Sequence, residues 1–446
     1  MPLPRPLPSS RLPGAPTREP GAAGGGPPLL RDVHHEVLDN GLRVFLIQSN
    51  ELPIVSHWIW YSVGSRDERT GETGLSHFLE HMMFKGTERF PKGSIDTTTA
   101  RLGGNNNAMT SQDYTAYYFN LASDRWTAAL EIEASRMQGC LLDEVEFGSE
   151  KKVVLEELAM GEDEPWRPLW QAVESAAFRV HPYHHPIIGW REDLERLDRD
   201  TMLGYYRRHY TPDRASLVLV GDLEVDAAMA AVREHMGPIP SSGRPRDAVL
   251  AEEPQKGERR VTVRFPGNLS RCAMCWHTTR TGTREDVVLD VASTLLSGGK
   301  ASRLYKGLVQ GRELASTAEC YNETRLDPGL FWVLGEARPE TDPADLERGL
   351  LEEVDRLVQD GPDEKELARA KKQILNGFFF SLETASSQAQ RIGLSEVLAA
   401  DGWAVLQRYP GELGGVEARD VQDVLARHIG EDNRTVGWSR PPRGDA

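Results

Sequence analysis

Two histidines and a glutamate stand close together in residues 74–86, GLSHFLEHMMFKG. The apolar residues of this segment recur at helical spacing, which predicts a helix. Positions four apart lie on one face of a helix, so His77 and His81 direct two imidazoles at one point, and Glu80 borders it. Imidazole and carboxylate groups are typical zinc ligands, and the order H-x-x-E-H is a known metal-hydrolase motif.

The predicted helix has strongly apolar flanks, so we expect it to be buried, with Thr73 as its N-cap. An isolated pair of histidines four residues apart is more often two exposed polar side chains. In a buried helix, however, the polar triplet is costly without a partner, and a metal ion supplies one. A catalytic zinc site needs a third protein ligand and keeps one position for water.

A later helix can provide the third ligand. The pattern predicts this helix over residues 143–160, with Gly161 beyond its end. Glu150 and Glu157 lie two turns apart along one side of it, next to the apolar stripe. We favour Glu157 as the ligand and Glu150 as a carboxylate that orients a histidine, but spacing alone does not choose between them.

These features together resemble a known family. Residues 64–68 (GSRDE), the H-x-x-E-H helix with residues 84–87 (FKGT) after it, and the downstream glutamate are typical of the pitrilysin-type (M16) zinc peptidases. The chain most resembles the shorter bacterial members and the beta subunit of the mitochondrial processing peptidase. The resemblance implies zinc ligands His77, His81 and Glu157, the catalytic base Glu80, and the supporting carboxylate Glu150.

A chain of 446 residues is too long for one ordinary core, and its strands and helices alternate in an α+β order. Residues 1–32 are rich in Pro, Gly and Arg, which predicts a disordered tail. We expect a zinc-bearing catalytic domain over 33–237, a linker over 238–259 and a metal-free second domain over 260–446. The resemblance implies that the two domains are similar, each a mostly antiparallel sheet packed with helices, and together form half of a clamshell.

The resemblance implies hydrolysis of peptide bonds. Zinc lowers the pKa of bound water from about 15.7 towards about 7, and Glu80 can take the proton and deliver it to the leaving amine. Residues 103–110 (GGNNNAMT) resemble the edge strand of the family on which an extended substrate adds as another strand, with Asn107 and Ala108 as contacts. Without the resemblance, this segment would be interpreted as an ordinary Gly/Asn turn.

One part of the family pattern is missing. Active single-chain relatives carry an arginine and a tyrosine in the metal-free half, which bind the substrate backbone and stabilise the oxyanion. Val309 and Ser316 stand at those positions here, and Arg312 and Tyr321 lie near them at the wrong spacing. This resembles the zinc-bearing subunits of two-subunit members, which implies a heterodimer with a partner that supplies the pair, or a homodimer. Loss of an oxyanion donor costs roughly 10²- to 10³-fold in rate, so we expect weak activity alone.

Composition excludes several classes of protein. The formal net charge of −16 argues against a nucleic-acid-binding protein, and no apolar run is long enough to predict a transmembrane helix. Four cysteines are few for this length, which favours a reducing compartment and a cytoplasmic location over an organelle matrix. Cys272 and Cys275 fall in a predicted strand, where residues three apart point to opposite faces, so we do not interpret them as a metal site.

Two alternatives to a general zinc endopeptidase subunit remain. A non-catalytic scaffold subunit of the same fold is disfavoured, because a scaffold has no need to keep Glu80 beside a complete ligand set. A presequence-processing peptidase is the narrower alternative within the enzymes. An acidic groove would favour it, since presequences are basic.

Overall fold

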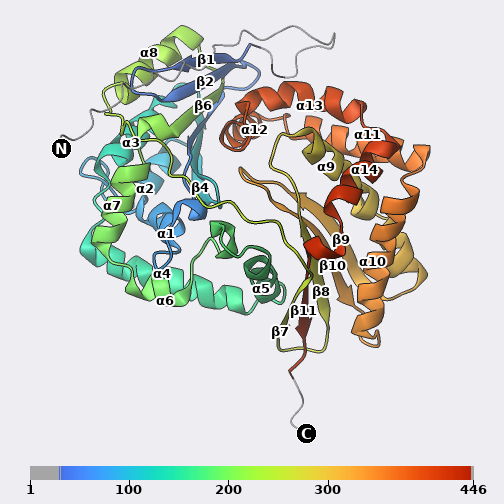
Figure 1. Ribbon diagram of the computed structural model, residues 1–446. Helices are drawn as coiled ribbons and strands as arrows, with labels where there is room; N and C mark the ends of the chain where they lie inside the picture. The colour runs from blue at the N-terminus through green and yellow to red at the C-terminus, as the bar shows by residue number, and fades with distance from the viewer. Residues whose placement is uncertain (1–29, 31, 443–446) are drawn as a thin grey trace, which may run out of the picture.

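The computed structural model describes residue 30 and residues 32–442, so the predicted tail over residues 1–32 lies almost wholly outside the described residues. The two halves of the chain lie side by side, and each contains one sheet with helices around it (Figure 1). The first half contains, in chain order, β1 (His34–Val37), β2 (Arg43–Gln48), β3 (Ile54–Tyr61), α1 (Leu75–Met82), α2 (Ser94–Arg101), β4 (Asn105–Thr110), β5 (Thr115–Ala122), α3 (Thr127–Gly139), α4 (Glu144–Glu162), α5 (Arg167–Ala177), α6 (Arg191–Arg196), α7 (Arg199–His209), β6 (Ala215–Gly221) and α8 (Val225–Met236).

The second half begins after a segment that has no helix or strand between residues 240 and 258. It contains, in chain order, β7 (Arg259–Arg264), β8 (Arg271–His277), α9 (Arg284–Ser297), a π-helix (Tyr305–Gly311), β9 (Ala315–Glu323), β10 (Leu330–Ala337), α10 (Pro343–Asp360), α11 (Glu364–Phe380), α12 (Ala385–Leu398), α13 (Val405–Gly414), α14 (Ala418–His428) and β11 (Arg434–Arg440). No helix in the described range is both long and apolar enough to cross a membrane.

The second sheet repeats the strand plan of the first, except that it has no counterpart of the edge strand β1. Within the described residues the first sheet has the order β1-β2-β6-β3-β5-β4 and the second has the order β7-β11-β8-β10-β9. Each contains a single parallel pair, β2 with β6 and β7 with β11, and the other neighbours are antiparallel. Helix α9 lies between β8 and β9 in the chain, as α1 and α2 lie between β3 and β4. The α+β fold with two similar, mostly antiparallel sheets is therefore confirmed.

Each half covers one face of the other half's sheet with a helix (Figure 1). Helix α5 comes from the first half, and its Val173 packs in one apolar cluster with Cys275 and Trp332 of the second sheet. Helix α12 comes from the second half, and its Ile392 packs with residues of the first sheet that include Trp60. Apolar contacts across the division of the chain therefore hold the two halves together.

The alternation of side chains along strand β8 agrees with its sequence. Cys272 packs in the cluster on the face covered by α9 and α10, and Cys275 packs on the opposite face, under α5. All four cysteines are buried and none forms a disulfide bond. The interpretation of Cys272 and Cys275 as unrelated strand residues is confirmed.

Candidate metal centre

Helix α1 begins one residue later than its sequence predicts, and the predicted cap is wrong. Its N-cap is Gly74, at φ 88°, and the hydroxyl of Thr73 donates instead to Asp193 (2.7 Å). The free N–H groups of Gly74 and Ser76 donate to the carboxylate of Glu68, at 2.8 and 2.7 Å. Glu68 therefore accepts the hydrogen bonds that an N-cap side chain would accept. Burial raises the pKa of Glu68 to about 8, against the lowering effect of these hydrogen bonds.

Apolar packing sets α1 against α4. The ring of Phe78 lies 4.7 Å from that of Phe147, and Val154 and Leu158 are buried in the same core. Helix α4 has a local reason for its start, since the side chain of Asp143 accepts hydrogen bonds from the first free N–H groups. This packing brings Glu150 and Glu157 of α4 towards the face of α1 that carries the two histidines.

The structure brings His77, His81 and Glu157 together. Each offers one donor atom, and these atoms all lie within 4.8 Å of one another, the only such group of His, Cys, Asp or Glu among residues 30 and 32–442. The carboxylate of Glu157 lies 3.6 Å from Nε2 of His77 and 3.7 Å from Nε2 of His81. Ligand atoms bound at about 2.1 Å around a tetrahedral zinc ion lie about 3.4 Å apart, so the donor set fits zinc.

The electrostatics of the cluster suit metal binding. Burial, together with the charges of His81 and Arg167, lowers the pKa of His77 to about 4. His77 is therefore neutral near pH 7, as a metal ligand must be. The side chain of Glu157 remains 44% exposed, so one side of the cluster is open to solvent.

Glu150 lies behind His81. Its carboxylate is 2.9 Å from Nδ1 of His81 and also pairs with the ammonium of Lys85. Burial alone would raise the pKa of Glu150, but hydrogen bonds from Lys85 and His81 outweigh it and hold the pKa below its usual value. An ionised carboxylate only accepts, so Nδ1 of His81 carries the proton and its Nε2 lone pair is left free towards Glu157.

Glu80 is beside the cluster and has a partner that the sequence did not reveal. The hydroxyl of Thr110, at the end of β4, donates to its carboxylate at 2.5 Å. Burial raises the pKa of Glu80, while the hydrogen bond from Thr110 lowers it. Thr110 belongs to residues 103–110, the segment predicted to bind substrate. The sequence did not predict its hydrogen bond to Glu80, because that bond depends on the packing of β4 against α1.

The segment with Asn107 and Ala108 is a strand and not a turn. It forms β4, the last strand of the first sheet, so one of its edges is unpaired in the described chain. The side chain of Asn107 is exposed, and its oxygen accepts the N–H of Ala108 at 2.9 Å. An added strand would therefore compete with this side chain for a backbone group of β4.

The residues near the missing Arg/Tyr pair are otherwise engaged. Val309 packs against the core of the second half, and the hydroxyl of Ser316 donates to Glu336. The guanidinium of Arg312 pairs with Glu352 and, at 3.2 Å, with Glu353. Tyr321 stacks on Trp332, with 6.2 Å between ring centroids.

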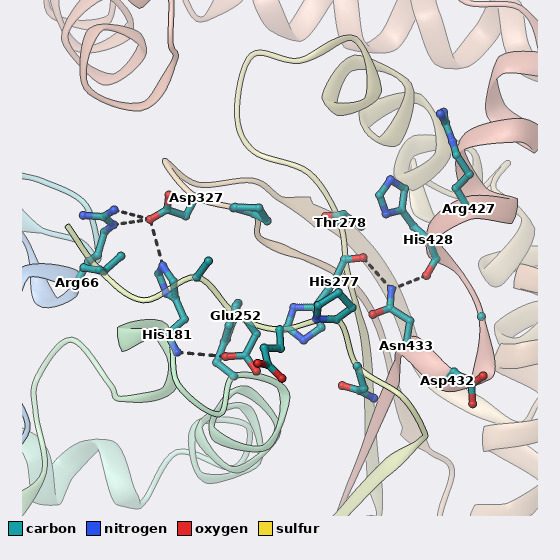
Figure 2. A pocket seen from close by; sticks show the side chains of 18 of the residues that line it. Arg66, His181, Glu252, His277, Thr278, Asp327, Arg427, His428, Asp432 and Asn433 are labelled. Atoms are coloured by element: carbon teal, nitrogen blue, oxygen red, sulfur yellow. Dashed lines mark hydrogen bonds and ion pairs between the residues drawn. The ribbon is translucent and has the colours of Figure 1, made fainter.

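A separate cavity of about 730 Å³ lies at the junction of the two halves (Figure 2). None of the predicted site residues lines it. Asp327 accepts hydrogen bonds there from Arg66 (2.6 Å) and His181 (3.1 Å), and Glu252 accepts the backbone N–H of His181. Both carboxylates of this region are thus engaged with groups of the chain itself, so we interpret it as a structural junction between the halves.

Comparison with known proteins identifies the class. Residues 43–190 match the family model described as "Insulinase (Peptidase family M16)", and residues 196–374 match "Peptidase M16 inactive domain". An uncharacterized zinc protease of Mycobacterium tuberculosis is 31% identical over 411 residues, which cover 88% of this chain and 89% of that protein. The uncharacterized zinc protease YmxG of Bacillus subtilis is 28% identical over 393 residues, which cover 88% of this chain and 95% of that protein.

More distant similarity includes a probable mitochondrial-processing peptidase subunit beta of Arabidopsis thaliana, 25% identical over 402 residues, which cover 88% of this chain and 75% of that protein. Among solved structures, a protease from Helicobacter pylori has a TM-score of 0.89 at 26% identity, covering 92% of this chain and 100% of that one. The chain belongs to the M16 family of zinc proteases. It is a metalloprotease of that family, and the predicted resemblance is confirmed.

Proposed function

We propose that the chain is a zinc endopeptidase subunit that cleaves peptides or small unfolded proteins by attack of a water molecule on the scissile carbonyl. His77, His81 and Glu157 would hold one zinc ion, which supplies a Lewis acid and lowers the pKa of coordinated water. The observation that carries this proposal is the convergence of their three donor atoms within 4.8 Å. Glu150 supports it by fixing the tautomer of His81.

Glu80 is the proposed general base. It is adjacent to His81 in the chain but is not part of the three-atom cluster, so its carboxylate remains free for proton transfer. The hydrogen bond from Thr110 fixes its orientation, and burial keeps its pKa above the ordinary value, which brings it closer to neutral pH. After the carbon–nitrogen bond breaks, the same carboxyl delivers the proton to the leaving amine.

The unpaired edge of β4 is the proposed substrate-binding strand. An extended peptide that adds to it would form backbone hydrogen bonds next to α1, which carries His77 and His81. Asn107 and Ala108 would contact this peptide. The oxygen of Asn107 has to release the N–H of Ala108 when the substrate adds, so this side chain can exchange an internal hydrogen bond for one to the peptide.

A partner subunit completes the proposed site. Val309 and Ser316 cannot replace the missing arginine and tyrosine, and both Arg312 and Tyr321 are held by other residues. We infer that a related chain with the Arg/Tyr pair supplies these groups in a heterodimer. A homodimer is the alternative assembly, but a second copy carries the same Val309 and Ser316 and would not restore the pair. Four buried thiols without disulfides support a cytoplasmic location.

The test uses zinc-loaded protein and internally quenched peptides of mixed sequence. We expect slow hydrolysis by the chain alone, a rise of about 10²- to 10³-fold when the partner is added, and loss of activity after treatment with a zinc chelator. Full activity of a monomer, established by light scattering under assay conditions, would contradict the partner requirement. Absence of hydrolysis with every candidate partner would favour the scaffold alternative.

A further inference from the structure

Arg167, the first residue of α5, lies against the glutamate side of α4. A Cβ atom built on Gly161 would lie 1.9 Å from Nη1 and 2.3 Å from Cζ of Arg167, so the guanidinium occupies the space that any other residue at 161 would fill. Gly161 follows Glu157 by four residues and therefore lies one turn, about 6 Å, further along the same face. A glycine inside a helix is unfavourable, and here it makes room for an arginine beside the candidate metal centre.

This guanidinium has no counter-ion among the residues that the structure describes, since no carboxylate lies within ion-pair distance of it. The absence is notable because three acidic residues, at positions 162–164, lie at the end of α4 and directly after it. The nearby Arg191 does pair with one of them, Glu162, at 3.2 Å. Arg167 is instead partly buried, and its charge acts on His77.

We propose that Arg167 binds a carboxylate of the peptide substrate and makes the chain prefer acidic peptides; this proposal rests on the proposed function. A guanidinium matches a carboxylate with two parallel hydrogen bonds, and its planar fork is the geometry that such recognition requires. Arg167 lies against Gly161, one helical turn from Glu157, and an extended peptide advances about 3.3 Å per residue, so we expect the bound carboxylate within about three residues of the scissile bond. A basic side chain at this point would meet a like charge, which disfavours presequences as substrates.

The carboxylate can come from two sources, an Asp or Glu side chain or the C-terminus of the peptide. Pairs of fluorescent peptides separate them. One set exchanges Asp for Asn at each of three positions on either side of the scissile bond, and the other exchanges a free C-terminus for an amide. Affinities are measured by fluorescence anisotropy on the zinc-loaded Glu80→Gln chain, with the partner where one is required.

We expect one acidic peptide to bind about 10- to 100-fold more tightly than its neutral twin, from charge-assisted hydrogen bonds to one guanidinium. In the Arg167→Gln chain the affinities of the acidic peptide and its neutral twin should differ by no more than about two-fold, while the affinity of the neutral twin stays as in the parent. Gly161→Ala keeps the charge but displaces the guanidinium, so it also reduces the ratio. Arg191→Gln removes an equal charge from a neighbouring helix and leaves the ratio unchanged.

The proposal is overturned if the ratio of acidic to neutral affinity is the same in the parent and Arg167→Gln chains. It is also overturned if the parent shows no preference for acidic peptides, or if acidic peptides fail to bind at millimolar concentration. The corresponding ratios of kcat/KM, measured with Glu80 intact, should change in parallel. If the peptides bind but are never hydrolysed, the proposed function fails, while the binding ratios still decide the role of Arg167.

Discussion

Replacing Glu150 with glutamine tests how His81 is held. The carboxylate accepts the Nδ1–H of His81 at 2.9 Å and pairs with Lys85, so Glu150→Gln replaces a charged acceptor by a neutral one and leaves the ammonium without a partner. Loss of such a supporting carboxylate typically weakens metal binding by about 10- to 100-fold, or about 1.4 to 2.7 kcal/mol. Because Lys85 is only 23% exposed and its charge then repels a cation, we expect a result near the upper limit.

The assay for this variant is competition for zinc against a chelator of known affinity, with thermal unfolding of the metal-free proteins as a check on folding. The matched control is Glu146→Gln on the same helix, where the lost partner is the exposed Lys92 at 2.8 Å. Exposed ion pairs contribute about 1 kcal/mol or less to stability, and Glu146 does not contact either histidine. The zinc affinity of Glu146→Gln should therefore stay within about two-fold of the parent. If Glu150→Gln also binds zinc as tightly as the parent, the proposed orientation of His81 is refuted.

Three further predictions address the base, the junction and the exchanged helices. Glu80→Gln should reduce peptide hydrolysis by about 10²- to 10⁴-fold with zinc affinity unchanged, and a variant that still hydrolyses peptide would exclude Glu80 as the base. Burial raises the pKa of Asp327, but hydrogen bonds from His181 and Arg66 outweigh it and lower the pKa to about 2. The ionised Asp327 therefore stabilises the fold above about pH 4, and this stabilisation is lost as pH falls towards 2. We expect Asp327→Asn to lower the free energy of unfolding by about 1 to 2 kcal/mol at pH 7. The difference in thermal midpoint between the parent and the variant should shrink in acid. Gly393→Ala would place a Cβ 2.0 Å from the indole nitrogen of Trp60 and should cost about 1 to 3 kcal/mol in chemical unfolding, whereas Gly377→Ala on α11 has free space and should cost nothing.

Local patterns were sufficient to predict the two helices of the candidate site. The helical spacing of apolar residues places α1 and α4 correctly, and the alternation around Cys272 and Cys275 identifies a strand buried on both faces. The exchange of α5 and α12 between the halves could not be predicted in this way. An amphipathic stripe indicates that a helix buries one face, but it does not indicate which sheet receives that face.

The errors at the site arose from contacts distant in sequence. Thr73 has the residue type of an N-cap, but Asp193 binds its hydroxyl and Glu68 receives the free N–H groups. The sequence predicts that Gly161 follows the end of a helix, because glycine often ends one. Helix α4 continues through it to Glu162, and the side chain of Arg167, which only the folded structure brings there, fills the space that a Cβ at this position would occupy.

The central claim is that His77, His81 and Glu157 hold one zinc ion. The most direct measurement is an anomalous difference map of the crystallised protein at the zinc absorption edge, combined with metal analysis of the same sample. We predict one zinc ion per chain, about 2.0 to 2.2 Å from Nε2 of both histidines and from a carboxylate oxygen of Glu157. A zinc-loaded sample with no anomalous peak between these three side chains, or with its metal bound elsewhere, would contradict the account.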